Sequence, residues 1–253
     1  MATSKPRLLV TRPAAQSAHL CTLLESAGYE VLRLPAIEIL DPVNLHDLET
    51  VSDELDSYDL AVFVSVNAVQ KGVEFVLDRR EWPENTAIAT VGARSAGALL
   101  PYGLSTDYVP EHRFNSEALL ALDELQDMTG QRVAVFRGNG GREYLRDTLL
   151  ERGAEVDYIE VYRRSCPVVD TAAMLKLLQP GYLDCVTVTS NETLQNLYNM
   201  AGTAGQPLLC ELPLVVVSKR QSVLAGQLGF RREPQLAANA CDEAIVAAVR
   251  RAG

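Results

Sequence analysis

The stretch LLVTRPAAQSAHLCTLLESAGYEV, residues 8–31, decides the fold, because VAVFRGNGGREYLRDTLLERGAEV at residues 133–156 repeats its pattern. Each stretch starts with a short apolar run, continues with a helical pattern that closes on a glycine, and ends in a second strand-like run. Strands that are apolar along their whole length are typical of parallel sheets covered on both faces. The two stretches therefore predict strand–helix–strand units of an α/β fold.

Two further pairs of segments continue this repeat. LAVFVSVNAVQ from Leu60 resembles DCVTVTSNETLQ from Asp184, each being a strand, a Ser and an Asn that opens a helix. AIATVGARSAGALLPYG from Ala87 resembles PLVVVSKRQSVLAGQLG from Pro213, each being a strand, a small residue, an Arg, a helix and a closing Gly. Because the three units recur in the same order, we interpret the chain as two similar α/β domains. Chance similarity among βα units is the alternative.

The same patterns predict the individual elements. The predicted strands are Arg7–Thr11, Tyr29–Leu34, Tyr58–Val64, Thr86–Val91, Gln131–Phe136, Glu155–Tyr162, Asp184–Thr189 and Leu212–Val217. The helices expected between them include Ala14–Ala27, Ala68–Leu77, Arg142–Arg152 and Glu192–Met200. The repeat leaves the division of the chain open. Either the domains are contiguous halves that meet near residue 126, or they exchange segments through crossings at Leu34–Ile39 and Tyr158–Arg163.

Composition excludes several classes of protein. With 253 residues, 47% of them hydrophobic and 22% charged, the chain can fill a sizeable core and is neither disordered nor fibrous. A net charge of −10 argues against a nucleic-acid binder, which normally carries a basic surplus. The five cysteines lack any C-x-x-C pair, so we expect buried thiols in a reducing cytosol. No apolar run reaches the length of about 20 residues that spans a membrane.

The loops after the predicted strands carry the candidate binding residues. In sheets of this kind, ligands bind beyond the carboxyl ends of the strands, where loops lead into helix N-termini. These loops combine hydroxyl, amide and Arg side chains with uncovered backbone N–H groups, which suits an anionic ligand. The candidates are Thr11, Arg12, Ser65, Val66, Asn67, Gly92, Arg94, Ser95, Arg137, Gly138, Ser190, Asn191, Ser218, Lys219 and Arg220. For each loop taken singly, ordinary helix N-capping is the alternative.

Other motifs are less informative. The loop RGNGGR at residues 137–142 lacks both the Lys-Ser/Thr ending of a P-loop and the Rossmann spacing, which disfavours nucleotide binding. The histidines form no metal-ligand pattern, and we expect solvated surface positions for His19, His46 and His112. Tyr162 differs, because a phenol in a predicted crossing beside Arg163 and Arg164 can deliver a proton. Interfacial packing of its ring is the alternative.

Seven segments occur in a specific order along nearly the whole chain. They are VTRP at Val10–Pro13, AVFVSVNAV at Ala61–Val69, ATVGARSAGAL at Ala89–Leu99, RGNGGRE at Arg137–Glu143, EVYRR at Glu160–Arg164, VTSNETLQNL at Val188–Leu197 and VVVSKRQSVLAGQLGF at Val215–Phe230. In this order and spacing they resemble the uroporphyrinogen-III synthase family. The resemblance implies two doubly wound parallel-sheet domains, joined by a two-stranded linker, with the active-site cleft between them. It assigns residues 1–36 and 166–253 to one domain and residues 37–165 to the other.

The resemblance also implies an enzyme. The expected reaction is a lyase reaction of heme biosynthesis, the cyclisation of hydroxymethylbilane to uroporphyrinogen III with inversion of ring D and loss of water. The family uses neither a metal nor an organic cofactor. Its proposed proton-donating tyrosine falls on Tyr162, and its product-contacting loops fall on Ser65, Asn67, Gly92, Arg94, Ser190, Asn191, Lys219 and Arg220. The sequence SKRQ at 218–221 departs from the Pro and Thr of many relatives, which favours backbone contacts there.

The expected partners follow from this resemblance. We expect a cytoplasmic monomer that takes a linear tetrapyrrole as its small-molecule partner and binds neither nucleic acid nor membrane. Transient contact with the preceding or following pathway enzyme is left open. Two alternatives to the synthase remain at this point. One is a two-domain anion-binding or sensor module without turnover, and the other is a nucleotide-dependent sugar or phosphate enzyme that uses the RGNGGR loop.

Overall fold

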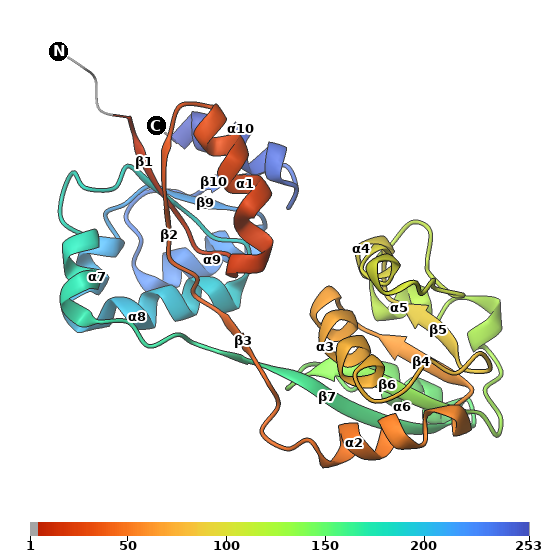
Figure 1. Ribbon diagram of the computed structural model, residues 1–253. Helices are drawn as coiled ribbons and strands as arrows, with labels where there is room; N and C mark the ends of the chain where they lie inside the picture. The colour runs from red at the N-terminus through yellow and green to blue at the C-terminus, as the bar shows by residue number, and fades with distance from the viewer. Residues whose placement is uncertain (1–4, 253) are drawn as a thin grey trace. The chain divides into compact units, whose positions relative to one another are not determined.

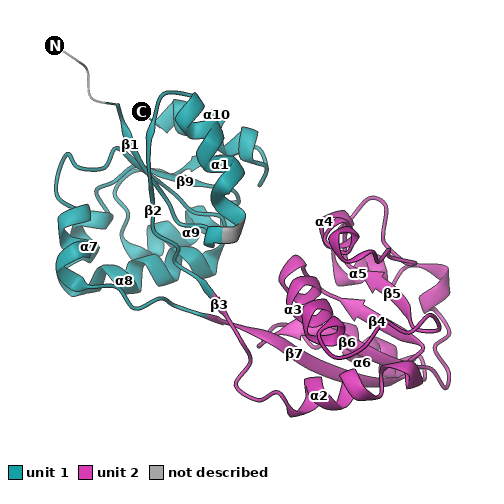
Figure 2. Ribbon diagram, in the orientation of Figure 1, with its two compact units in different colours: residues 1–38, 165–253 teal, residues 39–164 magenta. Residues whose placement is uncertain are grey.

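The chain divides into two compact units (Figures 1 and 2), of which the computed structural model describes residues 5–252. Unit 1 consists of residues 1–38 and 165–253, and unit 2 consists of residues 39–164. The chain passes from unit 1 to unit 2 within one strand, β3, and returns at the end of another, β7. These two strands are neighbours in one sheet.

Unit 1 contains a parallel five-stranded sheet with the order β10-β9-β8-β1-β2. Its strands are β1 (Arg7–Val10), β2 (Glu30–Arg33), β8 (Cys185–Thr187), β9 (Leu214–Val216) and β10 (Gln235–Leu236). Its helices are α1 (Ala14–Ser26), α7 (Thr171–Leu177), α8 (Asn191–Leu209), α9 (Lys219–Leu228) and α10 (Asp242–Ala252). Both faces are covered. Leu9 packs with residues of α7, α8 and α9, whereas Leu8 and Val10 pack with residues of α1 and α10.

Unit 2 contains a second sheet, with the order β3-β7-β6-β4-β5. Its strands are β3 (Glu38–Leu40), β4 (Leu60–Phe63), β5 (Ala87–Thr90), β6 (Arg132–Gly138) and β7 (Glu155–Ser165), of which β4 to β7 pair in parallel. Its helices are α2 (His46–Asp53), α3 (Val66–Leu77), α4 (Ala93–Gly97), α5 (Ser116–Leu119) and α6 (Tyr144–Glu151), with short 3-10 turns η1 (Leu55–Ser57), η2 (Leu100–Tyr102) and η3 (Asp123–Leu125). Phe63 and Phe136 stack at 4.8 Å in the core beneath α3.

The sequence repeat explains why the two sheets share one strand order. In each sheet, the strand–helix–strand stretch supplies two neighbouring strands, β2-β1 or β7-β6, and the next two strands are β8-β9 or β4-β5. The first stretch of the chain therefore pairs with strands near its end, as Leu8 does with Cys185. This pairing excludes the alternative of contiguous halves. A single parallel bridge from Ala89 to Tyr108 lies beside β5 where β10 lies beside β9 in the other unit.

The predicted elements agree with the structure apart from a few details. All eight predicted strands are present. Strand β3 overlaps the predicted crossing Leu34–Ile39, and β10 lies outside the predicted elements. Helix α8 continues past the predicted end at Met200, with a kink at Gly202. Gly28 and Gly153 follow α1 and α6 with φ angles of 95° and 87°, the left-handed conformation expected of helix-closing glycines.

The cysteines agree only in part with the prediction. All five are free thiols, and Cys21, Cys185 and Cys210 are buried. The prediction of burial is wrong for Cys166 and Cys241, which are exposed because they lie in the segments that follow β7 and precede α10. No helix within residues 5–252 combines the length and the apolar character that crossing a membrane requires.

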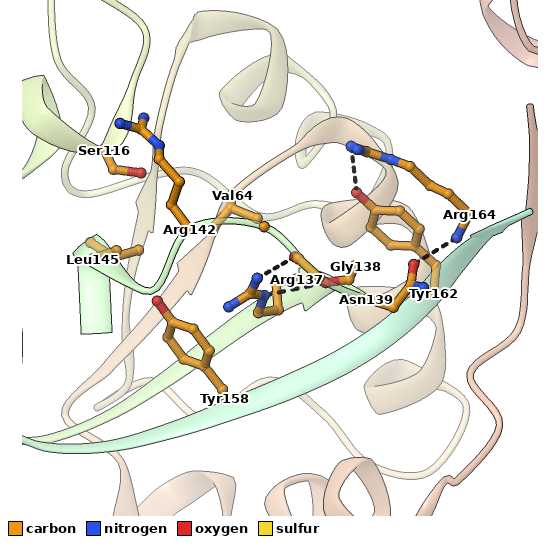
Figure 3. A pocket seen from close by; sticks show the side chains of 12 residues that line it. Val64, Ser116, Arg137, Gly138, Asn139, Arg142, Leu145, Tyr158, Tyr162 and Arg164 are labelled. Carbon is orange, nitrogen blue, oxygen red and sulfur yellow. Dashed lines mark hydrogen bonds between the residues drawn. The ribbon is translucent and has the colours of Figure 1, made fainter. Parts of the chain in front are cut away.

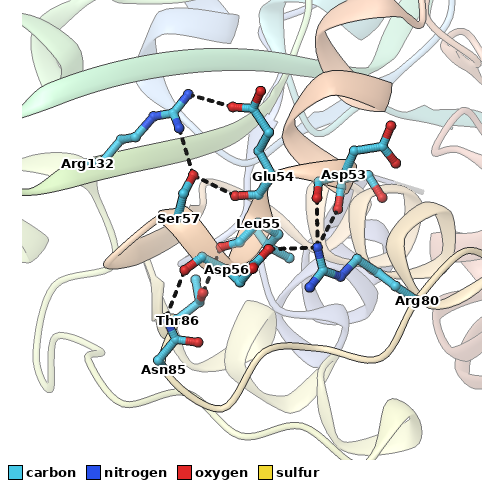
Figure 4. Close-up of polar contacts among 10 residues, drawn as sticks. Asp53, Glu54, Leu55, Asp56, Ser57, Arg80, Asn85, Thr86 and Arg132 are labelled. Carbon is cyan, nitrogen blue, oxygen red and sulfur yellow. Dashed lines mark hydrogen bonds and ion pairs between the residues drawn. The ribbon is translucent and has the colours of Figure 1, made fainter.

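A polar network joins the loops at the amino ends of the strands of unit 2 (Figure 4). Arg132, the first residue of β6, donates to Ser57 Oγ at 2.7 Å and to Glu54 at 3.1 Å. Arg80 donates to the Asp53 carbonyl at 2.9 Å and pairs with Asp56. These bonds connect α2 and η1 to the sheet. The opposite, carboxyl edge of the sheet carries the predicted site.

Candidate functional site

Tyr162 lies on β7 with only 1% of its surface exposed. Its Oη atom is 3.2 Å from Ser65 Oγ, at the carboxyl end of β4. The same Oη atom is 3.4 Å from a guanidinium nitrogen of Arg164 (Figure 3). Either hydroxyl can donate to the other. The structure thus combines the predicted proton donor with one predicted binding residue, Ser65, and with Arg164, which the prediction mentioned only as a sequence neighbour.

A break in the pairing of β6 with β7 directs the Tyr162 side chain. Arg137 pairs with Glu160, but the next residue, Gly138, pairs with Tyr162, so that Val161 is passed over. Side chains alternate between the two faces of a regular strand, which would place Tyr162 opposite Val161. The extra residue instead returns Tyr162 to the buried cluster that holds Val161 and residues of α3.

Gly138 leaves the space that the phenol ring occupies. A Cβ atom at residue 138 would lie 2.5 Å from Tyr162 Cε2 and 2.8 Å from its Oη, closer than real contacts allow. Gly138 does not have a positive φ angle, so the need for glycine here comes from the neighbouring ring and not from the backbone. The predicted site residue Gly138 therefore acts by allowing close approach.

A cavity of about 190 Å³ borders this tyrosine (Figure 3). The loop of residues 138–142 lines it together with Tyr158, Tyr162 and Arg164. Gly140 and Gly141 have φ angles of 67° and 108°, which lets the loop turn tightly after β6. The cavity residues Asn139, Arg142, Tyr158 and Arg164 were not among the predicted site residues, although two of them belong to the RGNGGR motif.

Arg137 lines the cavity and also holds this loop. Only 7% of its surface is exposed, and its guanidinium group donates to Glu143 at 3.1 Å and to the carbonyls of Gly138 and Gly140. It also lies 4.5 Å from the centre of the Tyr158 ring. Because the Arg137 guanidinium group is buried and already donates to acceptors of the protein, we leave its side chain out of the proposed binding set.

Two predicted residues of unit 1 also have internal roles. Arg12 forms a hydrogen-bonded ion pair with Asp242 and donates to the Ala240 carbonyl at 3.0 Å. Thr11 is fully buried and donates to the Thr187 carbonyl at 2.7 Å. Both side chains thus form hydrogen bonds within unit 1, and their contact with substrate stays a prediction.

Burial alone would raise the pKa of Asp242, but hydrogen bonds from His19 and Arg12 outweigh it and lower that pKa. His19 Nδ1 lies 2.8 Å from the Asp242 carboxylate. The lowered pKa keeps Asp242 ionised at neutral pH, so the pair with Arg12 holds the start of α10 beside the end of β1.

The predicted serines cap helices. Ser65, Ser190 and Ser218 are the N-caps of α3, α8 and α9, and each hydroxyl accepts from the backbone N–H three residues later. At Ser218 the Gln221 side chain completes a capping box. The capping alternative therefore holds for these hydroxyls. The first-turn N–H groups of a helix, here at Val66, Asn67 and Asn191, have no acceptor within the helix itself, and their binding of an anion stays a prediction.

Three predicted cations are exposed. Arg94 lies in α4 after β5, and Lys219 and Arg220 open α9 after β9. Within residues 5–252 none of the three forms an ion pair with a carboxylate. Gly92, the N-cap residue of α4, and Ser95, within α4, are buried, and Phe114 packs against Gly92.

Comparison with known proteins identifies the family. Residues 18–239 match the family described as uroporphyrinogen-III synthase HemD. The chain belongs to the uroporphyrinogen-III synthase family. The uroporphyrinogen-III synthase of Escherichia coli K12 is 34% identical over 245 residues, which cover 96% of this chain and 99% of that protein. Membership in the family confirms the resemblance carried by the seven segments, and with it a role in tetrapyrrole biosynthesis.

Solved structures show the same fold. A mutant uroporphyrinogen III synthase of Thermus thermophilus superposes with a TM-score of 0.63 at 18% identity and covers 98% of both chains. The uroporphyrinogen-III synthetase of Helicobacter pylori 26695 also gives 0.63, at 13% identity, over 98% of this chain and 99% of that one. The predicted α/β class with parallel sheets is therefore confirmed. Within residues 5–252, no three His, Cys, Asp or Glu side chains gather as a metal site would require.

Proposed function

We propose that the chain cyclises hydroxymethylbilane to uroporphyrinogen III, with inversion of ring D and loss of water, and that Tyr162 donates the proton for the departing hydroxyl. The observation that carries this assignment is the phenol of Tyr162, fixed beside a cavity and hydrogen-bonded to Ser65 in a member of this family.

The chemistry requires little from the protein. The terminal hydroxymethyl group loses its oxygen as water once a proton reaches it, and the C–O bonding electrons leave with that oxygen. The methylene carbon becomes an azafulvene cation that its own pyrrole nitrogen stabilises. To invert ring D, the cationic methylene carbon first bonds to the substituted α-carbon of ring D, which gives a spirocyclic pyrrolenine. The bond from that α-carbon to the methylene bridge of ring C then breaks, the bridge becomes a second azafulvene, and it bonds to the free α-carbon of ring D. Loss of the proton from this carbon completes the inverted macrocycle. Positioning and electrostatics are thus the main contributions expected of the protein.

Carboxylate binding is assigned to the exposed cations and the helix N-termini. Hydroxymethylbilane is a polycarboxylate, and Arg94, Lys219 and Arg220 are exposed without an internal carboxylate partner among the described residues. An Arg can bind a carboxylate through two parallel N–H bonds, and a helix N-terminus adds backbone donors. We therefore assign substrate binding to these three side chains and to the N–H groups near Asn67 and Asn191.

Incubation with hydroxymethylbilane, oxidation of the product and separation of the type I and type III isomers tests this function. The wild-type chain should give type III, whereas the substrate alone closes to type I. Tyr162→Phe should lower the rate of type III formation by roughly 10- to 100-fold, at the low end for a general acid because the pyrrole itself drives departure of the hydroxyl.

The outcomes separate the parts of the proposal. Only type I product from the wild-type chain would refute the synthase assignment. An unchanged rate in Tyr162→Phe would remove Tyr162 as the proton donor, and complete loss of type III would mean that the phenol is indispensable. Tyr198→Phe provides the control, because Tyr198 lies in α8 of unit 1 and leaves the cavity unchanged.

A further inference from the structure

We propose that Asn139 is a positioning residue for the reaction and fixes the segment of β7 that carries the Tyr162 phenol; this inference rests on the proposed function. Asn139 follows the last residue of β6, where the regular ladder with β7 ends. Its side chain continues the pairing in place of a strand.

Asn139 forms one hydrogen bond with the backbone of Tyr162 and another with the backbone of Arg164. The Asn139 backbone N–H donates to the Tyr162 carbonyl at 3.0 Å. The Arg164 backbone N–H donates to Asn139 Oδ1 at 2.8 Å, so that a side-chain amide accepts where a strand carbonyl would otherwise accept (Figure 3). Residues 162–164 are thereby held at both ends by one residue.

The two Asn139 bonds lie where the regular pairing of β6 with β7 ends. The register shift between Arg137 and Gly138 interrupts the ladder immediately before Tyr162, and β6 ends at Gly138 while β7 continues to Ser165. Beyond the shift, the Asn139 N–H supplies one further backbone bond, and its side chain replaces the next one that a longer β6 would supply. Without the side-chain bond, the segment from Tyr162 to Arg164 keeps fewer fixed points.

The position of the Tyr162 phenol depends on this backbone segment, because its hydrogen bond to Ser65 is already long. Tyr162 Oη lies 3.2 Å from Ser65 Oγ, near the outer limit of a hydroxyl hydrogen bond. A displacement of about 1 Å at the backbone breaks that bond and moves the proton donor away from the reacting atom. Asn139 itself is exposed and contributes little to the core, so its replacement should change positioning more than folding.

A double-mutant cycle tests the inference. Asn139→Ala should lower kcat for type III formation by roughly 3- to 10-fold, the effect of one lost hydrogen bond, while KM changes by less than about twofold. In the Tyr162→Phe background, which lacks the proton donor, the same substitution should have almost no further effect. Asn139→Asp retains an acceptor for the Arg164 N–H and should recover most of the lost kcat.

Asn85→Ala is the matched control. Its side chain likewise forms one hydrogen bond to the backbone, here by donating to the Asp56 carbonyl at 2.9 Å, but at the amino end of the sheet (Figure 4). This variant should keep the wild-type kcat.

The outcomes separate the inference from the proposed function. A multiplicative loss in the double variant would overturn the positioning role, as would failure of Asn139→Asp to recover kcat. If the wild-type chain forms no type III isomer, the proposed function fails and the inference fails with it. If the wild-type chain is active but Tyr162→Phe is equally active, the proton-donor assignment fails alone, and Asn139 then has no phenol to position.

Discussion

Replacement of Gly138 by Ala should displace the Tyr162 ring and impair both stability and product specificity. The added methyl carbon would lie 2.5 Å from Cε2 and 2.8 Å from Oη, about 1 Å inside ordinary contact. The ring is fully buried among residues of β4, β6 and α3, so it cannot move without disturbing them. Such overpacking costs about 1–3 kcal/mol, and loss of the bond to Ser65 adds about 1 kcal/mol.

Thermal unfolding and the isomer assay together measure this effect. A loss of about 2–4 kcal/mol corresponds to a Tm lower by roughly 4–16 °C in a chain of this size. The type III fraction should fall, because the displaced phenol no longer reaches the leaving hydroxyl while spontaneous closure to type I continues.

Gly97→Ala is the control, because nothing lies within 4 Å of a Cβ at that helical position. It should leave Tm unchanged or raise it slightly, since Ala favours a helix over Gly by about 0.5–1 kcal/mol. Wild-type stability and a wild-type isomer ratio in Gly138→Ala would refute the argument that Gly138 exists to admit the ring. In a Tyr162→Ala background, Gly138→Ala should destabilise the chain by less than in the wild type, because the colliding ring is gone.

Three further predictions concern other parts of the chain. Asp242→Asn should lower the free energy of unfolding by about 1–2 kcal/mol at pH 7 without changing kcat. Because the folded pKa of Asp242 lies below its unfolded value of about 3.9, this stabilisation is lost as the pH falls through the folded pKa. Urea titrations should therefore show that the difference in stability between variant and wild type disappears below about pH 4. Lys219→Ala and Arg220→Ala should each raise KM by roughly 3- to 30-fold, less so at high salt, with Tm unchanged, and Lys176→Ala should leave KM unchanged. A thiol reagent should modify Cys241 and Cys166 in the native chain, Cys166 more slowly because burial and Glu38 raise its pKa. The other three cysteines should react only after unfolding, since burial raises the pKa of Cys185 to about 12.

The fold could be predicted because its information is local. Apolar runs, helical periodicity and closing glycines predicted eight of the described strands, and the order of the repeats indicated two similar units. The other two, Glu38–Leu40 and Gln235–Leu236, have three and two residues and each begins with a polar residue. They lack the continuous buried apolar run that marks the equally short strands Cys185–Thr187 and Leu214–Val216. The exchange of segments depends on which distant strands pair, and the repeat by itself left that open.

The site was harder to predict because it depends on partners far apart in sequence. Arg12 is held by a carboxylate 230 residues later, and nothing in its own loop distinguishes it from an exposed anion-binding Arg. Asn139 was visible in a motif, yet its role arises from a register shift that no sequence pattern announces. Tyr162 was found through its neighbours in the EVYRR segment, while its contact with Ser65 requires the pairing of β4 with β6.

The internal repeat separates scaffold from site. Arg12 and Arg137 occupy the same position in the two strand–helix–strand stretches, and both are used internally, on Asp242 in one unit and on Glu143 and loop carbonyls in the other. The next position differs, since Pro13 stands in one unit where Gly138 stands in the other, and only Gly138 admits a buried tyrosine. The Arg that both units share thus holds a loop after the first strand of each stretch. A residue found in one unit only, such as Gly138, shows where the two copies have diverged. Tyr162, Gly138 and Asn139 are all of the second kind, which is why the proton-transfer step is assigned to unit 2 alone.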